Sequence, residues 1–219
     1  MSKNKLARFE ENKHFAHLFQ YTDYDTSQSP FPMKGRWREL YFKNQGPVVL
    51  ELGCGGGEYT VALAERFPDK NFIGADRKGA RLWKGCKKVE NLQLPNVAFL
   101  RVNIEAIVDY FAPDEIDEIW ITFPDPQPKK PRKRLTSPQF IARYRELLTP
   151  EGIIHLKTDS DLLYQYTILT AQEQHWKIRE KIDNIYLDNA IPLLTDIQTF
   201  YEQMWLKENR VISYLQMNI

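Results

Sequence analysis

The sequence has few cysteines and no long apolar run. Cys54 and Cys86 are its only cysteines, and because they form no C-x-x-C pair they argue against a disulfide scaffold and a zinc site. The four histidines are scattered, without acidic or cysteine partners at metal spacing. No segment approaches the roughly 18 apolar residues that cross a bilayer, and the first fifteen residues lack the apolar core of a secretory signal. We therefore expect a reduced, cytoplasmic protein without a metal or a membrane partner.

The sequence also has almost no net charge, since 30 basic and 29 acidic residues leave a formal charge of +1. Its basic residues are nevertheless concentrated at one place, where five of six consecutive positions are Lys129, Lys130, Arg132, Lys133 and Arg134. A dense basic run in a neutral protein favours a local anionic partner over general electrostatic attraction. A solvated surface without a partner is the alternative interpretation.

Strand-like and helix-like patterns alternate after residue 45. Residues 1–45 are polar and aromatic, and we expect them to form a partly flexible N-terminal arm ahead of one domain at 46–219. Strands are predicted at 48–52, 71–76, 97–102, 118–123 and 152–156, with helices between them. This alternation predicts an α/β fold with a mostly parallel sheet, whose ligands bind beyond the carboxyl ends of the strands.

A glycine-rich loop follows the first predicted strand. Glu51 precedes Gly53 and Gly55 on the way into a helix, and Asp76 ends the next strand. Glycines allow the backbone to approach a ligand closely, and the acid suits a ribose diol. A dinucleotide fingerprint needs glycine where Glu58 stands, and an anion before the loop suits a cationic ligand, so we favour S-adenosylmethionine. A tight turn without a ligand is the simpler alternative.

A second loop, Phe123-Pro124-Asp125-Pro126-Gln127-Pro128-Lys129-Lys130, follows the fourth predicted strand. Its three prolines restrict the backbone and hold Asp125 on a stiff segment, which can position a catalytic group. The lysines bring phosphate-binding charge to the same place.

At these residues the sequence resembles the bacterial tRNA (guanine-N7)-methyltransferases, from about Val49 to the C-terminus. The most specific matches are the loop above, Lys133-Arg134-Leu135-Thr136, Lys157-Thr158-Asp159 and Thr199-x-Tyr201-Glu202. The resemblance implies a Rossmann-like methyltransferase fold with helices on both faces of a seven-stranded, mostly parallel sheet whose last strand is antiparallel. It also implies methyl transfer to guanine 46 in the variable loop of tRNA.

The resemblance assigns roles to single positions. Asp125 is the implied catalytic residue and contacts cofactor and guanine. The cofactor, S-adenosylmethionine, with S-adenosylhomocysteine as its product, would be held by Glu51, Gly53, Gly55, Asp76, Asn103 and Asp125. The tRNA would contact Lys129, Lys130, Arg132, Lys133, Arg134, Asp159, Thr199, Tyr201 and Glu202.

Four positions depart from the family pattern. Gln127 stands in place of a usual tryptophan, Arg132 of a histidine, Asn103 of an aspartate and Met204 of a basic residue. None of these changes removes a proposed catalytic carboxylate, so they bear more on substrate affinity than on reaction type.

Three other functions fit parts of the pattern. They are a small-molecule methyltransferase, a dinucleotide-dependent oxidoreductase, and an RNA-binding protein with a relic cofactor pocket. The basic run argues against the first, Glu58 against the second, and the retained acids Glu51, Asp76 and Asp125 against the third.

Overall fold

The computed structural model describes residues 3–21, 23–187 and 191–219. Its centre is an eight-stranded sheet in the order β1-β4-β3-β2-β5-β6-β8-β7. The strands are β1 Leu18–Gln20, β2 Val48–Leu52, β3 Asn71–Asp76, β4 Val97–Arg101, β5 Ile116–Thr122, β6 Leu148–Thr158, β7 Lys177–Ile182 and β8 Ser213–Asn218. All neighbours pair in parallel except β8, which is antiparallel to both β6 and β7. The predicted fold class is confirmed, with β1 as an additional strand at one edge.

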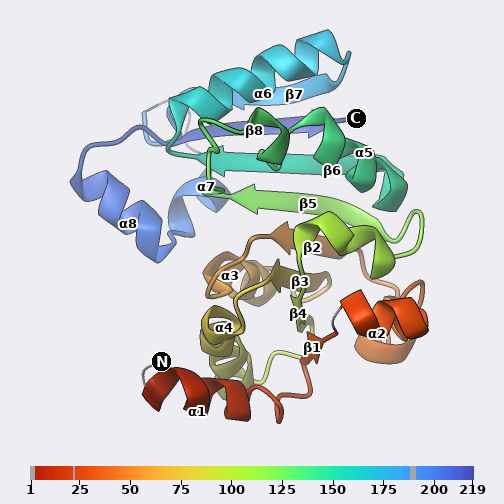
Figure 1. Ribbon diagram of the computed structural model, residues 1–219. Helices are drawn as coiled ribbons and strands as arrows, with labels where there is room; N and C mark the ends of the chain where they lie inside the picture. The colour runs from red at the N-terminus through yellow and green to blue at the C-terminus, as the bar shows by residue number, and fades with distance from the viewer. Residues whose placement is uncertain (1–2, 22, 188–190) are drawn as a thin grey trace.

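Helices cover both faces of this sheet (Figure 1). The α-helices are α1 Lys3–Glu11, α2 Asp23–Gln28, α3 Glu58–Arg66, α4 Gly79–Leu92, α5 Pro138–Leu147, α6 Asp161–Glu173, α7 Pro192–Asp196 and α8 Phe200–Lys207. The shorter elements are a π-helix η1 Trp37–Phe42 and the 3-10 helices η2 Ile104–Asp109 and η3 Pro131–Lys133. Apolar residues of α3 and α4 pack on one face, and those of α5 and α6 pack on the other.

The central strands are short apolar runs because both of their faces are covered. All residues of β2 and β3 are buried, as expected for parallel strands between two helical layers. The sequence pattern located β2, α3 and β3 at their observed bounds, since glycine, an acid or a polar turn ends each one. The N-cap of α6 is Ser160, whose hydroxyl accepts from the Leu163 amide at 3.3 Å.

The N-terminal segment contributes to the sheet and to the core. Strand β1 pairs with β4, and Phe31 and Trp37 are buried in the core cluster that includes the α5 and α6 residues. The Trp37 ring stacks on Phe111 with 5.7 Å between centroids, and its indole N–H donates to the Tyr110 carbonyl at 3.2 Å. These aromatic contacts are long-range, so the polar sequence around them gave no periodic signal. The flexibility expected for part of residues 1–45 stays a prediction, which amide hydrogen exchange would measure.

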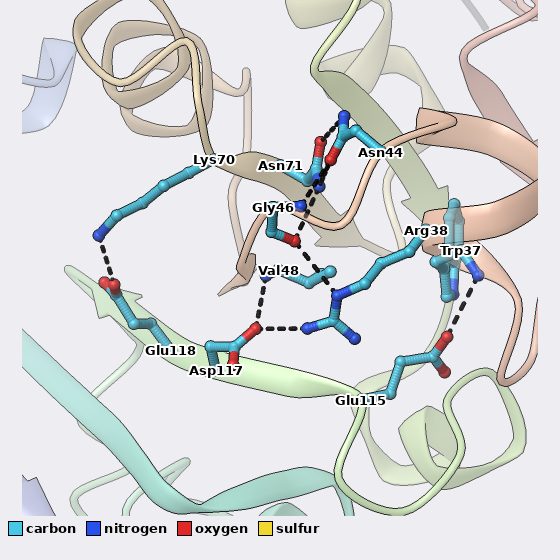
Figure 2. A network of polar contacts seen from close by, with 10 residues as sticks. All are labelled: Trp37, Arg38, Asn44, Gly46, Val48, Lys70, Asn71, Glu115, Asp117 and Glu118. Carbon is cyan, nitrogen blue, oxygen red and sulfur yellow. Dashed lines mark hydrogen bonds and ion pairs between the residues drawn. The ribbon is translucent and has the colours of Figure 1, made fainter.

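A polar network fixes this segment to the amino ends of the central strands (Figure 2). Asp117 of β5 accepts from the Arg38 guanidinium at 2.6 Å and from the Val48 amide at 2.7 Å. Glu115 accepts from the Trp37 amide at 3.2 Å, and Asn71 and Asn44 exchange side-chain bonds. The network occupies the amino ends of the strands. A ligand can therefore enter at the opposite ends of the same strands, their carboxyl ends.

Within the described ranges, no helix is long and apolar enough to cross a membrane. The same part of the chain holds no cluster of three or more histidine, cysteine, aspartate or glutamate side chains that could bind a metal ion.

Candidate active site

A cavity of about 390 Å³ lies beyond the carboxyl ends of β2 to β5. Five of the predicted site residues line it together, although they are up to 80 residues apart in the sequence. These are Gly53, Asp76, Asn103, Asp125 and Lys133. Arg77 and Lys78, just before α4, and Arg81 in its first turn also line the cavity, and the sequence did not predict a cofactor contact for them.

The glycine loop uses its glycines in two ways. Gly53 and Gly55 have φ of 75° and 59°, and a Cβ at either position would meet nothing within 4 Å. Gly57, with φ of 68°, lies against the Phe99 ring, and a Cβ there would approach the ring to 2.5 Å. The first two glycines therefore keep one side of the loop open for a ligand, and the third allows the loop to pack on the sheet.

Asp76 organises this loop from the end of β3. One carboxylate oxygen accepts from the Gly55 amide at 3.1 Å and the other from the Lys78 amide at 2.7 Å. Both bonds come from backbone amides, so they fix the carboxylate at the cavity wall. The side chain is therefore oriented before any ligand binds.

Glu51 lies beneath the loop and does not line the cavity. Its carboxylate accepts from the Thr60 amide at 2.9 Å, from the Thr60 hydroxyl and from the Thr122 hydroxyl at 2.6 Å. Burial raises the pKa of Glu51 to about 7, although these bonds favour the charged form. Glu51 therefore joins β2, β5 and the first turn of α3. The predicted contact between Glu51 and cofactor stays a prediction.

The loop from Phe123 to Lys130, here called the reaction loop, is held in a strained conformation. Phe123 and Gln127, which flank Asp125, have φ of 47° and 45°, a region that costs side-chain-bearing residues roughly 1 kcal/mol or more. The Asp125 carboxylate accepts from the Gln127 amide at 3.0 Å, and the side chain is otherwise exposed to the cavity. The loop thus presents a carboxylate at a fixed position beside the glycine loop.

The structure divides the basic run into two groups. Lys129, Lys130 and Arg132 are exposed. Lys133 forms an ion pair with Glu105 at 3.0 Å. Arg134 is buried: its Nε donates to the Pro126 carbonyl at 2.9 Å, and its guanidinium lies 4.2 Å from the centre of the Tyr166 ring. Arg134 is therefore a buried residue that stabilises the reaction loop through its bond to Pro126. The charge of the side chain alone did not indicate this role.

Among the predicted substrate residues outside the basic run, Tyr201 is exposed, only 16% of the Asp159 side chain is exposed, and Thr199 and Glu202 are buried. Asp159 follows β6 and forms an ion pair with Arg210 at 3.0 Å. Thr199 is the N-cap of α8, where its hydroxyl accepts from the Glu202 amide at 3.1 Å. The predicted tRNA contacts of these four residues stay predictions.

Sequence reasoning missed the role of Lys157, the single lysine of β6. Lys157 and Glu202 are both fully buried and are 2.8 Å apart. Burial lowers the pKa of Lys157 and raises the pKa of Glu202, and each effect is opposed by the partner's charge. In the sequence, Lys157 stands out only as part of the Lys-Thr-Asp motif. Its partner is 45 residues away, so nothing in the sequence indicated the buried pair.

The residues that line the cavity fit S-adenosylmethionine in their donor set. The open sides of Gly53 and Gly55 allow close approach, and Asp76 and Asn103 offer oxygens to a ribose diol. The accessible Asp125 carboxylate suits a ligand that carries positive charge. A carboxylate group of such a ligand is matched by the basic side chains at the start of α4.

Comparisons with solved structures define the fold first. A 16S rRNA methyltransferase, KamB, superposes with a TM-score of 0.62 at 15% identity, covering 90% of this chain and 94% of that one. A 30S ribosomal A1408 methyltransferase from an uncultured bacterium gives 0.59 at 17% identity over 81% and 89% of the two chains. The fold is therefore that of the Rossmann-like methyltransferases.

Sequence relatives define the particular family. A family model described as "Putative methyltransferase" matches residues 45–215. A tRNA (guanine-N(7)-)-methyltransferase of Bacteroides fragilis is 47% identical over 99% of this chain and 86% of the relative. One of Christiangramia forsetii is 47% identical over 100% and 99% of the two chains. The chain belongs to the tRNA (guanine-N7-)-methyltransferase family.

Proposed function

We propose that the protein transfers a methyl group from S-adenosylmethionine to N7 of a guanine in tRNA, at position 46 of the variable loop. The observation that carries this proposal is the position of Asp125. It lies on a stiff loop that shares one cavity with Asp76 and the glycine loop, and the same loop ends in the exposed Lys129 and Lys130. The relatives that support it are named tRNA (guanine-N(7)-)-methyltransferase and align with 99% to 100% of this chain.

The chemistry demands positioning more than proton removal. Guanine N7 carries an in-plane lone pair and needs no deprotonation before it attacks. The bound cofactor supplies an electrophilic methyl group on sulfur. The task of the protein is then to hold N7 in line with that methyl group at near-attack distance. The fixed positions of Asp76 and Asp125 on one cavity serve this purpose.

Asp125 contributes hydrogen bonding and charge. Its carboxylate accepts hydrogen bonds from the N–H groups on the donor edge of guanine, which orients the base. Methylation leaves positive charge on the purine, and a fixed carboxylate nearby stabilises that charge as it develops. No general base is required, because N7 carries no proton.

The exposed residues of the basic run bind the tRNA backbone. A guanine must leave its stack to enter the cavity, at a cost of roughly a few kcal/mol. Contacts from Lys129, Lys130 and Arg132 to flanking phosphates offset this cost. We propose that Asp159 and Tyr201 make further contacts with the substrate.

Nucleoside analysis tests the proposal. Unmodified tRNA that carries G46 and a G46-to-A46 transcript are incubated with the protein and methyl-labelled S-adenosylmethionine, then digested. The expected result is labelled 7-methylguanosine from the first tRNA and none from the second. Label on another nucleoside, or equal label on both transcripts, would contradict the proposed site of transfer.

A further inference from the structure

A buried lysine joins three segments at the carboxyl end of β6. The Lys157 ammonium donates to the Leu194 carbonyl at 2.6 Å, to the Ile197 carbonyl at 3.1 Å and to Glu202 at 2.8 Å. The first two acceptors belong to α7 and the residue after it, and the third to α8. In Figure 1 both helices lie beside the carboxyl ends of β5 and β6.

The partner carboxylate is equally enclosed. Glu202 also accepts from the Tyr186 hydroxyl at 2.8 Å, and its amide donates to the Thr199 hydroxyl at 3.1 Å. With 0% of either side chain exposed, Glu202 and Lys157 meet inside the protein and not at its surface. A substrate cannot reach Glu202 unless this arrangement opens.

Two further contacts connect the pair to the proposed active site. The Phe123 amide, at the start of the reaction loop, donates to the Lys157 carbonyl at 2.8 Å, and the ammonium lies 5.7 Å from the Phe123 ring centre. The Phe200 amide, at the start of α8, donates to Glu58 of α3 at 3.1 Å. The segment 191–207 is thus tied to both the reaction loop and the helix that follows the glycine loop.

We infer that the Lys157–Glu202 pair is a latch that positions residues 191–207, and that Glu202 acts through this latch and not by contact with the tRNA. This inference rests on the proposed function. Thr199 and Glu202 hold the first turn of α8, and the neighbouring Tyr201 side chain on that turn is exposed. Lys157 and Glu202 are therefore positioning residues.

The test uses Glu202→Gln, Lys157→Met and the double variant Lys157→Met with Glu202→Met. Removing one partner of a buried pair leaves an uncompensated charge or polar group, whereas apolar replacement of both is close to neutral. Lys181→Met is the matched control, because it removes a lysine from an exposed ion pair with Asp183. Should Lys157→Met fail to fold, Glu202→Gln carries the test, since it keeps the volume of the side chain.

Hydrogen exchange of residues 191–207 and steady-state kinetics are the two readouts. Both single variants should speed exchange in this segment and raise KM for tRNA at least about tenfold, with unchanged cofactor affinity. The double variant should recover most of both losses, and Lys181→Met should match the wild type.

Either of two results would overturn the latch. If the double variant has wild-type exchange but the same raised KM as Glu202→Gln, Glu202 contacts the tRNA itself. If the single variants change neither exchange nor KM, the pair positions nothing. Hydrogen exchange is measured without tRNA. It therefore still tests the latch if the protein turns out not to methylate tRNA.

Discussion

Glu51 combines full burial with three hydrogen-bond donors, and its ionisation should be visible in the stability of the protein. Burial raises the pKa of Glu51 from 4.5 to about 7. A carboxyl whose folded pKa lies above its unfolded value costs nothing below pH 4.5, and stability falls as pH rises between the two values. The cofactor-free wild type should therefore lose up to about 3 kcal/mol more than Glu51→Gln between pH 4.5 and 8.

Urea unfolding at several pH values measures this difference. Glu65→Gln, which changes an exposed glutamate on α3, the helix whose Thr60 donates to Glu51, is the control and should parallel the wild type. Parallel curves for wild type and Glu51→Gln would show that folding does not raise the pKa of this carboxyl, and would contradict the prediction.

Several residue roles could not be predicted from sequence because they depend on burial by distant segments. Glu51 was correctly marked as an acid before a glycine loop, but its donors come from α3 and from β5, 71 residues away. Arg134 appeared equivalent to Lys129 until the Tyr166 ring and the Pro126 carbonyl distinguished it. A motif gives the residue type, while packing decides whether the side chain faces a ligand.

Within the basic run, packing also separates residues of the same charge. Lys129 and Lys130 are exposed, whereas Arg134 is buried. If the lysines bind phosphates, each substitution to alanine should reduce the salt dependence of tRNA binding by about 0.7 to 0.9 in the slope of log K against log salt. Filter binding at several salt concentrations measures this slope.

Two controls accompany this measurement. Lys177→Ala, at an exposed position of β7, should leave the slope unchanged. Arg134→Ala should instead lower kcat, because it removes the bond to Pro126 in the reaction loop. An unchanged slope for both Lys129→Ala and Lys130→Ala would contradict the phosphate contacts.

Among the elements, the regular ones were predictable and the irregular ones were not. Strand β2, helix α3 and strand β3 were recognised because apolar runs and an amphipathic helix have clear periods bounded by glycine and polar turns. Strand β1 has only three residues, and the π-helix η1 is held by aromatic packing around Trp37. Neither leaves a periodic signal in the sequence.

In the whole molecule, the polar network that stabilises the fold and the proposed active site lie at opposite ends of the strands. The Arg38–Asp117–Val48 network lies at the amino ends of the strands, and the cavity lies at their carboxyl ends. Asp117→Ala leaves the Val48 amide and the Arg38 guanidinium without this partner, and should cost about 2 kcal/mol of unfolding free energy. Cofactor affinity of the folded variant should not change.

Chemical denaturation and cofactor titration test this separation, with exposed Asp114→Asn as the control. A variant that is as stable as the wild type, or one that folds well but binds cofactor more weakly, would contradict it.

The central claim is that Asp125 acts on the methyl transfer itself. Asp125→Asn tests it most directly, because an amide oxygen can still accept from the Gln127 amide and preserve the loop while the charge is lost. Single-turnover methylation of unmodified tRNA, with cofactor affinity measured in parallel, should show a rate about 10² to 10³ lower with the cofactor still bound. A wild-type rate of 7-methylguanosine formation in this variant would contradict the account.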